Sequence, residues 1–176
     1  MLFRETSLPG AFVIELQKHE DERGFFARSW CREEFEAHGL NSRMVQCNVS
    51  FNKVKGTLRG MHYQVPPCAE AKLVRCTRGA IHDVIIDLRR ESVTYRQHVS
   101  EVLSDNNYKA LFVPEGFAHG FQTLEDNSEV FYQMSEFYSP EHQRGVRYND
   151  PAFGINWPVD AMVISDRDRN YEDFRE

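Results

Sequence analysis

The sequence predicts an all-β fold, a jelly-roll barrel with a few short helices. Short runs rich in β-branched and aromatic residues recur along the chain, and clusters of Gly, Pro, Asn, Asp and Ser separate them at intervals of about ten residues. Many short strands with evenly spaced turns are typical of sandwiches and barrels, whereas alternating strands and long helices would indicate a parallel sheet. The 176 residues suit one domain, spanning 1–176, with a core of its own.

The predicted strands follow in order at 11–16, 71–76, 80–88, 110–114 and 129–138. The run AIHDVIIDL at 80–88 alternates most clearly, because its even-numbered positions share one face of the strand and its odd-numbered positions share the other. Two further segments have helical character. CREEFEAHG, residues 31–39, makes a helix that ends at Gly39, and residues 165–174 make a short C-terminal helix.

The charge balance and the apolar runs exclude several classes of function. The formal net charge is −6, which disfavours a duplex nucleic-acid binder, because such proteins are more often basic. No apolar run reaches the roughly 18 residues that span a bilayer, and Arg4 and Glu5 stand where the apolar part of a secretory signal would begin. The four cysteines form no CxxC pair. We therefore expect a cytoplasmic protein with reduced thiols and with no membrane or nucleic-acid partner.

Two histidine motifs raise the alternative of a metal site. GTLRGMHYQ, residues 56–64, places a glycine six positions before His62, as a cupin metal motif begins, and PEGFAH, residues 114–119, supplies His119 in the pattern of the second half. The second histidine of the first half is missing, because Gln64 occupies its position. Two histidines fall short of the three protein ligands that a catalytic zinc or iron site usually takes. The sequence therefore predicts no metal, and a metal-dependent cupin is a rival interpretation.

Basic residues surround His62 along the chain. Arg59 precedes it by three positions, and Lys72 follows on the next predicted strand. These neighbours favour a pocket over the alternative of a neutral histidine packed in the core. In a regular strand Arg59 and His62 would point to opposite faces. We predict that the strand bends or bulges at Gly60, so that both side chains line one pocket.

Eight motifs occur in the order seen in the dTDP-4-dehydrorhamnose 3,5-epimerase family, which the chain resembles from about residue 8 to 170: DERGFF, QCNVSFN, GTLRGMHYQ, AKLVRCTRGAIHDVIIDLR, VPEGFAHGFQTL, EVFYQMSEFYSPE, RGVRYNDPAFGINWP and ISDRD. The resemblance implies a cupin-like double-stranded β-helix, or jelly-roll barrel, that forms a homodimer and works without a metal or an organic cofactor. It also implies an isomerase, a nucleotide-sugar epimerase, that inverts C3, C5 or both in a nucleotide-diphosphate 4-keto-6-deoxyhexose of the dTDP-4-dehydro-6-deoxyglucose type. Such a reaction serves deoxysugar (rhamnose-like) carbohydrate biosynthesis.

The resemblance also assigns roles to residues that match the family motifs. His62 matches the catalytic base, Tyr132 the proton donor, and Asp168 the carboxylate that pairs with the base. Lys72 matches a substrate contact, where a cation would stabilise an oxyanion at O4 of the sugar. The other matches are substrate-binding positions, namely Arg23, Phe26, Arg28, Gln46, Asn48, Arg59, His119, Tyr138, Gln143 and Arg167.

These residue types suit proton transfer beside a ketone. C3 and C5 both flank the C4 ketone, so loss of a proton from either carbon gives an enolate, and the substrate supplies its own electron sink. Histidine, with an ordinary pKa near ~6.5, takes such a proton at neutral pH, and tyrosine, near ~10, returns one from the opposite face. An aspartate beside the histidine fixes its tautomer and stabilises the imidazolium. Arg23 and Arg59 suit a diphosphate, which forked guanidinium groups bind well.

Each role has a simpler alternative. Tyr132 could be a core tyrosine, and Asp168, three residues after Ser165, could serve only to begin the last helix. Lys72 could be a solvated charge on an edge strand, and Arg167 could be a surface charge. For Phe26, packing in the core is the alternative to a place on the pocket wall.

Two positions depart from the family pattern, and both fall among its nucleotide contacts. Arg28 and Gln143 stand where the family carries glutamate. A glutamate accepts the N3–H of thymine, whereas arginine can only donate. Because cytosine and guanine present acceptors, one hypothesis is a CDP- or GDP-linked sugar in place of a dTDP-linked one. The alternative is that Arg28 turns into solvent and thymidine binding is kept. Further rivals are a monoepimerase and a non-catalytic nucleotide-sugar binding protein with the same jelly roll.

Overall fold

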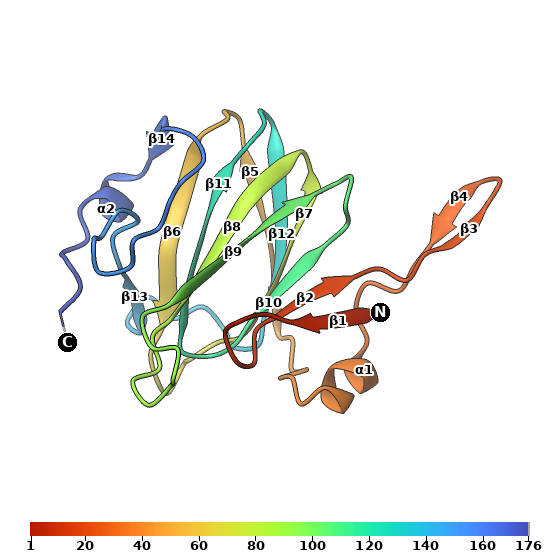
Figure 1. Ribbon diagram of the computed structural model, residues 1–176, viewed down its shortest axis with the longest axis horizontal. Helices are drawn as coiled ribbons and strands as arrows, with labels where there is room; N and C mark the ends of the chain where they lie inside the picture. Colours follow the sequence, from red (N-terminus) through yellow and green to blue (C-terminus); the bar gives the residue numbers. More distant parts are fainter. Residues whose placement is uncertain (176) are drawn as a thin grey trace.

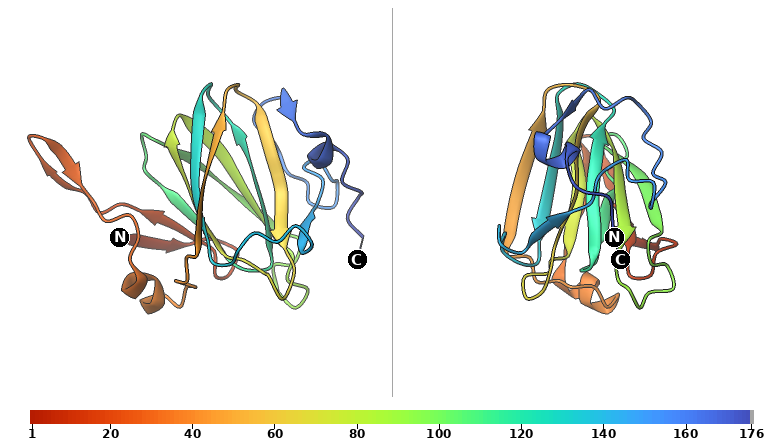
Figure 2. Two further views of the ribbon diagram at one scale, coloured as in Figure 1. Left: turned by 180° about the vertical axis from the view of Figure 1, so that it is seen from behind. Right: turned by 90° about the vertical axis from the view of Figure 1, so that its left-hand side faces the viewer.

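Two β-sheets face each other in the computed structural model, which describes residues 1–175 (Figure 1, Figure 2). The first sheet has the strand order β1 (Leu2–Glu5), β2 (Phe12–Glu15), β10 (Ala110–Val113), β7 (Lys72–Arg78), β12 (Ser128–Met134) and β5 (Gln46–Asn52). The second has the order β13 (Gln143–Gly145), β6 (Thr57–Gln64), β11 (Phe117–Thr123), β8 (Ala80–Asp87) and β9 (His98–Ser104), and β14 (Val163–Ile164) also pairs with β6. Strand β14 runs parallel to β6, and the other pairs are antiparallel. The prediction of an all-β fold is confirmed.

The five predicted strands correspond to β2, β7, β8, β10 and β12. The predicted strand at 129–138 is too long, because the chain bends after Met134 and leaves the sheet. The alternation pattern does not predict β1, β3 (His19–Asp21), β4 (Gly24–Phe26), β5, β9, β11, β13 or β14, and β6 is expected only from the motif around His62. In β6 and β11 the glycines Gly60 and Gly120 interrupt the apolar alternation on which strand prediction depends.

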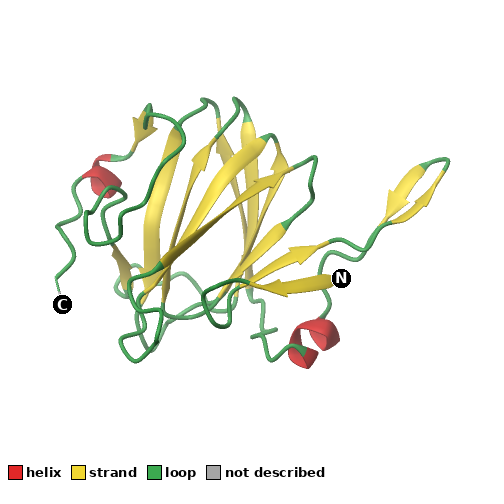
Figure 3. Ribbon diagram, in the orientation of Figure 1, coloured by secondary structure: helices red, strands yellow, loops and turns green. Residues whose placement is uncertain are grey.

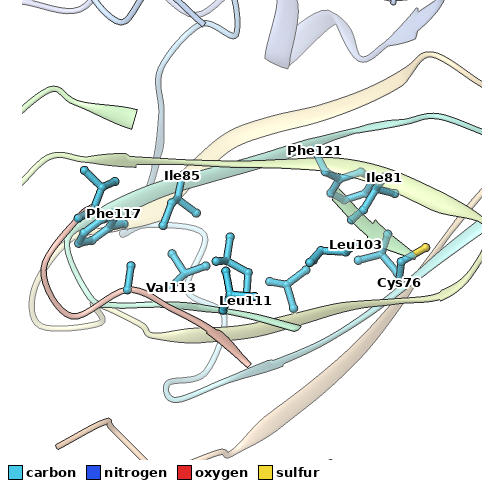
Figure 4. Packing of buried hydrophobic residues seen from close by; sticks show 13 residues of the cluster. Cys76, Ile81, Ile85, Leu103, Leu111, Val113, Phe117 and Phe121 are labelled. Atoms are coloured by element: carbon cyan, nitrogen blue, oxygen red, sulfur yellow. The ribbon is translucent and has the colours of Figure 1, made fainter. Parts of the chain in front are cut away.

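An apolar core fills the space between the sheets (Figure 4). Ile81 and Ile85 project from β8 into this cluster, where they join Leu103 of β9 and Leu111 of β10, and all four are fully buried. Burial of each such side chain contributes about 1.5–3 kcal/mol. The predicted alternation of β8 is therefore confirmed on its inner face.

The C-terminal part of the chain covers the outer face of the second sheet. Val84 and Ile86 of β8 belong to a separate buried cluster, which includes Val146 and Phe153. Because both faces of β8 are covered, its even-numbered positions are apolar as well. The chain then runs along β6 and forms β14 and the helix α2 (Asp166–Arg169), as Figure 1 shows.

A two-stranded hairpin projects from the body of the molecule and is called here the β3–β4 arm (Figure 1, Figure 2). It consists of β3 (His19–Asp21) and β4 (Gly24–Phe26). At its base the ring of Phe25 lies edge-on to that of Tyr108, with 4.9 Å between the ring centroids. The ammonium group of Lys18 lies over both rings. These contacts set the direction of the arm relative to the sheets.

Helices form a small part of the fold (Figure 3). The helix α1 (Arg32–Ala37) buries Phe35, and Gly39 follows its C-cap with φ +70°, so the predicted end at Gly39 is confirmed. The predicted C-terminal helix is limited to the single turn α2, which is shorter than 165–174. Neither helix within residues 1–175 is long and apolar enough to cross a membrane.

Candidate active site

A cavity of about 930 Å³ lies between the two sheets, on the side of β5 and β6. Its walls come from β5, β7 and β12 of the first sheet, from β6 and β11 of the second, and from the segment with β14 and α2. Most predicted site residues line it, namely His62, Tyr132, Asp168, Lys72, Gln46, Asn48, Arg59, His119, Tyr138, Gln143 and Arg167. A cavity of this size holds a small-molecule ligand.

His62 and Asp168 form a hydrogen-bonded pair at the cavity wall. Nε2 of His62 lies 2.7 Å from Oδ1 of Asp168, and Oδ2 of Asp168 accepts from the backbone N–H of Gly60 at 3.2 Å. Burial raises the pKa of Asp168, but the hydrogen bond and charge of His62, the Gly60 N–H and Arg167 hold that pKa below its ordinary value. The ionised carboxylate of Asp168 can only accept a hydrogen bond, so Nε2 of His62 carries the imidazole proton and donates to it. Nδ1 of the neutral ring then keeps a lone pair.

The alternative role of Asp168 was to begin the last helix. The structure agrees with this role for the backbone of Asp168 but not for its side chain. The N–H of Asp168 donates to Oγ of Ser165 at 3.1 Å, so Ser165 caps the helix. The carboxylate, 3 % exposed, instead reaches His62 and Gly60. The cap therefore holds Asp168 where its side chain meets the histidine.

Strand β6 bulges at Gly60, which brings Arg59 and His62 to the same cavity. His62 lies opposite His119 on β11, whereas Arg59 lies opposite Phe121, so β6 holds one extra residue in this interval. Gly60 has φ +133°, and a Cβ at this position would come within 2.5 Å of the β11 backbone. Only glycine meets both conditions. The predicted bend is confirmed.

Tyr132 reaches the cavity from the sheet opposite His62. It lies on β12, where it pairs with Asn48 of β5 and Val74 of β7. Burial raises the pKa of Tyr132, and the smaller lowering by the charge of Arg59 does not cancel this effect. The phenol is therefore protonated at neutral pH. Its ring also packs against the core, so the core alternative describes the ring but not its place on the cavity wall.

Lys72 is buried on β7, a central strand, so the alternative of a solvated edge charge is wrong. Its Nζ lies 2.8 Å from Oε1 of Glu70 and donates to the backbone carbonyl of His62 at 3.3 Å. The sequence pattern does not single out Glu70. Its position could have identified it, because Glu70 stands two residues before Lys72 and both side chains then lie on one side of an extended chain.

A second histidine–carboxylate pair lies on β11 and β8. Nε2 of His119 lies 2.8 Å from Oδ1 of Asp83, which is fully buried. The sequence pattern gives Asp83 no role, although it occupies an inward, odd-numbered position of β8. Nearby, Nε of Arg59 donates to Oδ1 of Asn52 at 2.7 Å. Arg59 and His119 thus both line the cavity with side chains that a second residue holds in place.

Amide and guanidinium groups border the cavity on the side of α2 and β13. Oε1 of Gln143 accepts from the Tyr138 hydroxyl at 2.7 Å and from Nη1 of Arg167 at 2.9 Å. Oε1 of Gln46 accepts from the Tyr138 backbone N–H at 3.1 Å, and its Nε2 donates to Oδ1 of Asn48 at 3.1 Å. About half of the Arg167 side chain is exposed, yet the bond to Gln143 holds it at the cavity. The surface-charge alternative therefore describes only part of this side chain.

Three predicted substrate contacts, Arg23, Phe26 and Arg28, do not reach the cavity of their own chain. They lie on or beside the β3–β4 arm, which points away from the sheets (Figure 2). Arg23 pairs with Asp21, and Arg28 pairs with Glu34 at 2.8 Å. Phe26 is 76 % exposed, so it lies neither on this cavity wall nor in the core.

Each cavity histidine lies beside a single carboxylate, Asp168 for His62 and Asp83 for His119. Within residues 1–175, no group of three His, Cys, Asp or Glu side chains is arranged to hold a metal ion. Gln64, at the position of the missing histidine, uses its amide on the backbone. Its Nε2 donates to the carbonyls of Cys68 and Phe137, and its Oε1 accepts from the N–H of Ser139. Gln64 therefore anchors two loops.

A family model described as dTDP-4-dehydrorhamnose 3,5-epimerase matches residues 5–176. The chain belongs to this family. The dTDP-4-dehydrorhamnose 3,5-epimerase of Methanothermobacter thermautotrophicus is 45 % identical to it, over 99 % of this chain and 95 % of that protein. Membership of the dTDP-4-dehydrorhamnose 3,5-epimerase family makes the protein an enzyme of the epimerase class.

Solved structures of the epimerase family superpose closely on this chain. The Bacillus anthracis dTDP-4-dehydrorhamnose 3,5-epimerase, with TDP and PPi bound, is 41 % identical with a TM-score of 0.94, over 98 % of this chain and 99 % of that one. The Legionella pneumophila epimerase in complex with dTDP-4-keto-L-rhamnose is 36 % identical with a TM-score of 0.88, over 95 % of this chain and 89 % of that one. The predicted cupin-like jelly-roll fold is confirmed.

Proposed function

We propose that the protein epimerises a dTDP-linked 4-keto-6-deoxyhexose at C3 and C5, in deoxysugar biosynthesis. The observation that carries this proposal is the placement of His62 and Tyr132 on facing sheets around one cavity. Inversion at carbon needs one group to remove a proton from one face and another to return a proton to the opposite face. The substrate class is supported by the Legionella pneumophila relative, which is solved with dTDP-4-keto-L-rhamnose.

The first step is removal of a proton beside the ketone. Nδ1 of His62 accepts the proton from C3 or C5, and the electron pair of the C–H bond forms an enolate with its charge on O4. Asp168, 2.7 Å from Nε2, stabilises the imidazolium that results. One base serves both carbons in turn, because both flank the same ketone.

The second step returns a proton from the opposite side. The Tyr132 hydroxyl donates its proton to the carbon as the enolate reverts to the ketone. The raised pKa of Tyr132 favours the phenol, which is the form that can donate. Proton exchange with solvent then restores the neutral histidine and the phenol.

Cationic and N–H groups would hold the charged parts of the substrate. Lys72 lies beside the backbone of His62, so it can stabilise the negative charge at O4 as the proton leaves. Arg59 and His119 line the same cavity and suit the diphosphate. The carbonyl of the substrate is the electron sink in this scheme, so the proposed steps use no cofactor.

We also propose a homodimer in which the β3–β4 arm of each chain reaches the cavity of its partner. Arg23, Phe26 and Arg28 match substrate contacts of the family, yet they lie far from the cavity of their own chain. The arm exposes Phe26, and β5 exposes Val49 by 61 %. Exposed apolar side chains of this kind favour contact with a second chain.

The domain boundaries and the location that we propose are those that the sequence predicts. Residues 1–176 form one epimerase domain, and the location is cytoplasmic. A reducing compartment of this kind keeps the four cysteines as thiols.

The identity of the nucleotide has a rival within the proposal. Arg28 and Gln143 carry donor groups, which favours a cytosine or guanine base over thymine. However, Arg28 pairs with Glu34 at 2.8 Å, which engages its guanidinium within its own chain. The relatives solved with TDP and with dTDP-4-keto-L-rhamnose also support thymine. We therefore place dTDP first and CDP or GDP second. Tighter binding of free CDP or GDP than of dTDP would reverse this order.

The decisive experiment is incubation with dTDP-4-keto-6-deoxyglucose in D2O, followed by NMR of the sugar protons. We expect deuterium at C3 and C5 with the wild-type protein and none with His62→Ala. Deuterium at one carbon would make the enzyme a monoepimerase. Absence of deuterium with the dTDP-, CDP- and GDP-linked sugars alike would contradict the proposal and favour a non-catalytic nucleotide-sugar binding protein.

A further inference from the structure

Glu70 is a buried acid of the cavity to which the proposed reaction gives no role. It is 6 % exposed and lines the cavity beside Lys72. Its Oε1 lies 2.8 Å from Nζ of Lys72, and its Oε2 is buried without a hydrogen-bond partner among the described residues. Burial of a carboxylate is unfavourable unless it is paired. The Lys72 ammonium is the partner that the structure provides.

The contacts of Lys72 restrict the direction of its ammonium group. An ammonium has three N–H donors in tetrahedral directions. It forms an ion pair with Glu70 at 2.8 Å, and one N–H donates to the backbone carbonyl of His62 at 3.3 Å. These two partners come from two segments, the chain before β7 and strand β6, so together they orient the group. Lys72 also lines the cavity, so a remaining N–H can reach a ligand there.

We propose that Glu70 is a positioning residue, which holds the Lys72 ammonium so that an N–H directed into the cavity meets the ketone oxygen O4 of the bound sugar. The inference rests on the proposed function, because O4 becomes an oxyanion only in that reaction. His62 then acts twice. Its imidazole removes the proton, and its backbone carbonyl helps to aim the donor that stabilises the enolate. A donor that is oriented before the reaction needs no reorganisation during it.

The first test is Glu70→Gln, which keeps the shape of the side chain and removes its charge. We expect kcat to fall roughly 10- to 100-fold, because a misplaced donor stabilises the enolate less well. We expect the KM and the Kd for free dTDP to stay within about twofold of the wild type, since Glu70 does not contact the nucleotide in this proposal. The control is Glu129→Gln on β12, whose carboxylate accepts from Thr77 at an exposed site and whose kcat should match the wild type.

The second test asks whether Glu70 acts through Lys72. If it does, the double variant Glu70→Gln/Lys72→Met should be no slower than Lys72→Met alone. A further loss in the double variant, an effect on KM alone, or a Glu70→Gln kcat within about twofold of the wild type would overturn the inference. Should Glu70→Gln fail to fold, Glu70→Asp takes its place. The shorter side chain keeps the charge but draws the ammonium aside, so the same loss of kcat is expected.

The wild-type protein in the same assay separates the two proposals. Lack of turnover by the wild type would contradict the proposed function itself. Turnover by the wild type that Glu70→Gln leaves unchanged would remove only the role of Glu70.

Discussion

At the scale of single residues, the cavity is built from pairs in which a buried acid orients a second side chain. The pairs are His62 with Asp168, Lys72 with Glu70, and His119 with Asp83. In each pair the acid is almost fully buried, and its partner lines the cavity. The direction of each cavity group therefore depends on a residue that need not touch the substrate.

The pair of His62 and Asp168 leads to a prediction about the histidine tautomer. In Asp168→Asn the side-chain amide can donate to Nε2, which moves the imidazole proton to Nδ1 and removes the base. We expect kcat to fall by about 10³- to 10⁴-fold, as for the equivalent change in a catalytic triad, while dTDP still binds. Turnover of the keto sugar and calorimetric binding of dTDP measure the two quantities. Asp166→Asn, an exposed acid on the same turn, is the control, and a loss of less than about tenfold in Asp168→Asn would show that the tautomer does not matter.

At the scale of elements, the fold depends on irregular features beside regular strands. The bulge of β6 brings Arg59 and His62 to one cavity. The loop after β8 folds back onto Asp87. Each feature depends on one residue that a neighbouring strand or loop constrains, so single substitutions can test both.

Gly60→Ala tests the bulge. Gly24 is a matched control, because it also has a positive φ, +122°, but no atom lies within 4 Å of an added Cβ. For Gly60→Ala both the backbone conformation and the approach to β11 oppose the methyl group. We expect a loss of about 3 kcal/mol or more in unfolding free energy, against about 1–2 kcal/mol for Gly24→Ala. Urea denaturation measures the difference, and equal losses would show that the close approach to β11 is unimportant.

Asp87 gives a prediction of pH-dependent stability. Burial raises its pKa, but hydrogen bonds from Arg89, Ser92 and Thr94 outweigh burial and lower the pKa from 3.8 to about 2. Because the pKa is lower in the folded state, the ionised group stabilises the protein above pH 3.8, and this stability is lost as the pH falls toward 2. The loss is about 2 kcal/mol. Urea denaturation from about pH 5 to pH 2 should show it in the wild type and in the exposed-site control Glu91→Gln, but not in Asp87→Asn. Parallel pH profiles for all three would contradict the prediction.

At the scale of the whole molecule, sequence patterns predict strands and bends, which depend on neighbouring residues. They do not predict contacts between distant segments, which depend on the path of the chain. The alternation at 80–88 predicts a strand, and the conflict between Arg59 and His62 predicts a bend, because both depend on local periodicity. The roles of Glu70 and Asp83 are not predicted, since they depend on burial and on partners that no local pattern shows. The motif that contains Phe26 predicts a place on a cavity wall, whereas the β3–β4 arm carries it away from its own cavity.

The arm leads to the prediction that each active site is shared between two chains. An Arg23→Ala chain keeps an intact cavity and a defective arm, whereas a His62→Ala chain keeps an intact arm and an inactive cavity. Each variant alone should be nearly inactive. After subunit exchange in an equal mixture, half of the dimers contain one intact site, so activity should return to about one quarter of the wild type. A mixture of His62→Ala with Asp168→Asn is the control, because both changes damage the cavity and no dimer then holds an intact site. Analytical ultracentrifugation should show dimers throughout. Dimers without recovered activity would mean that the arm does not complete the active site of the partner chain. Monomers would contradict the proposal of a shared site altogether.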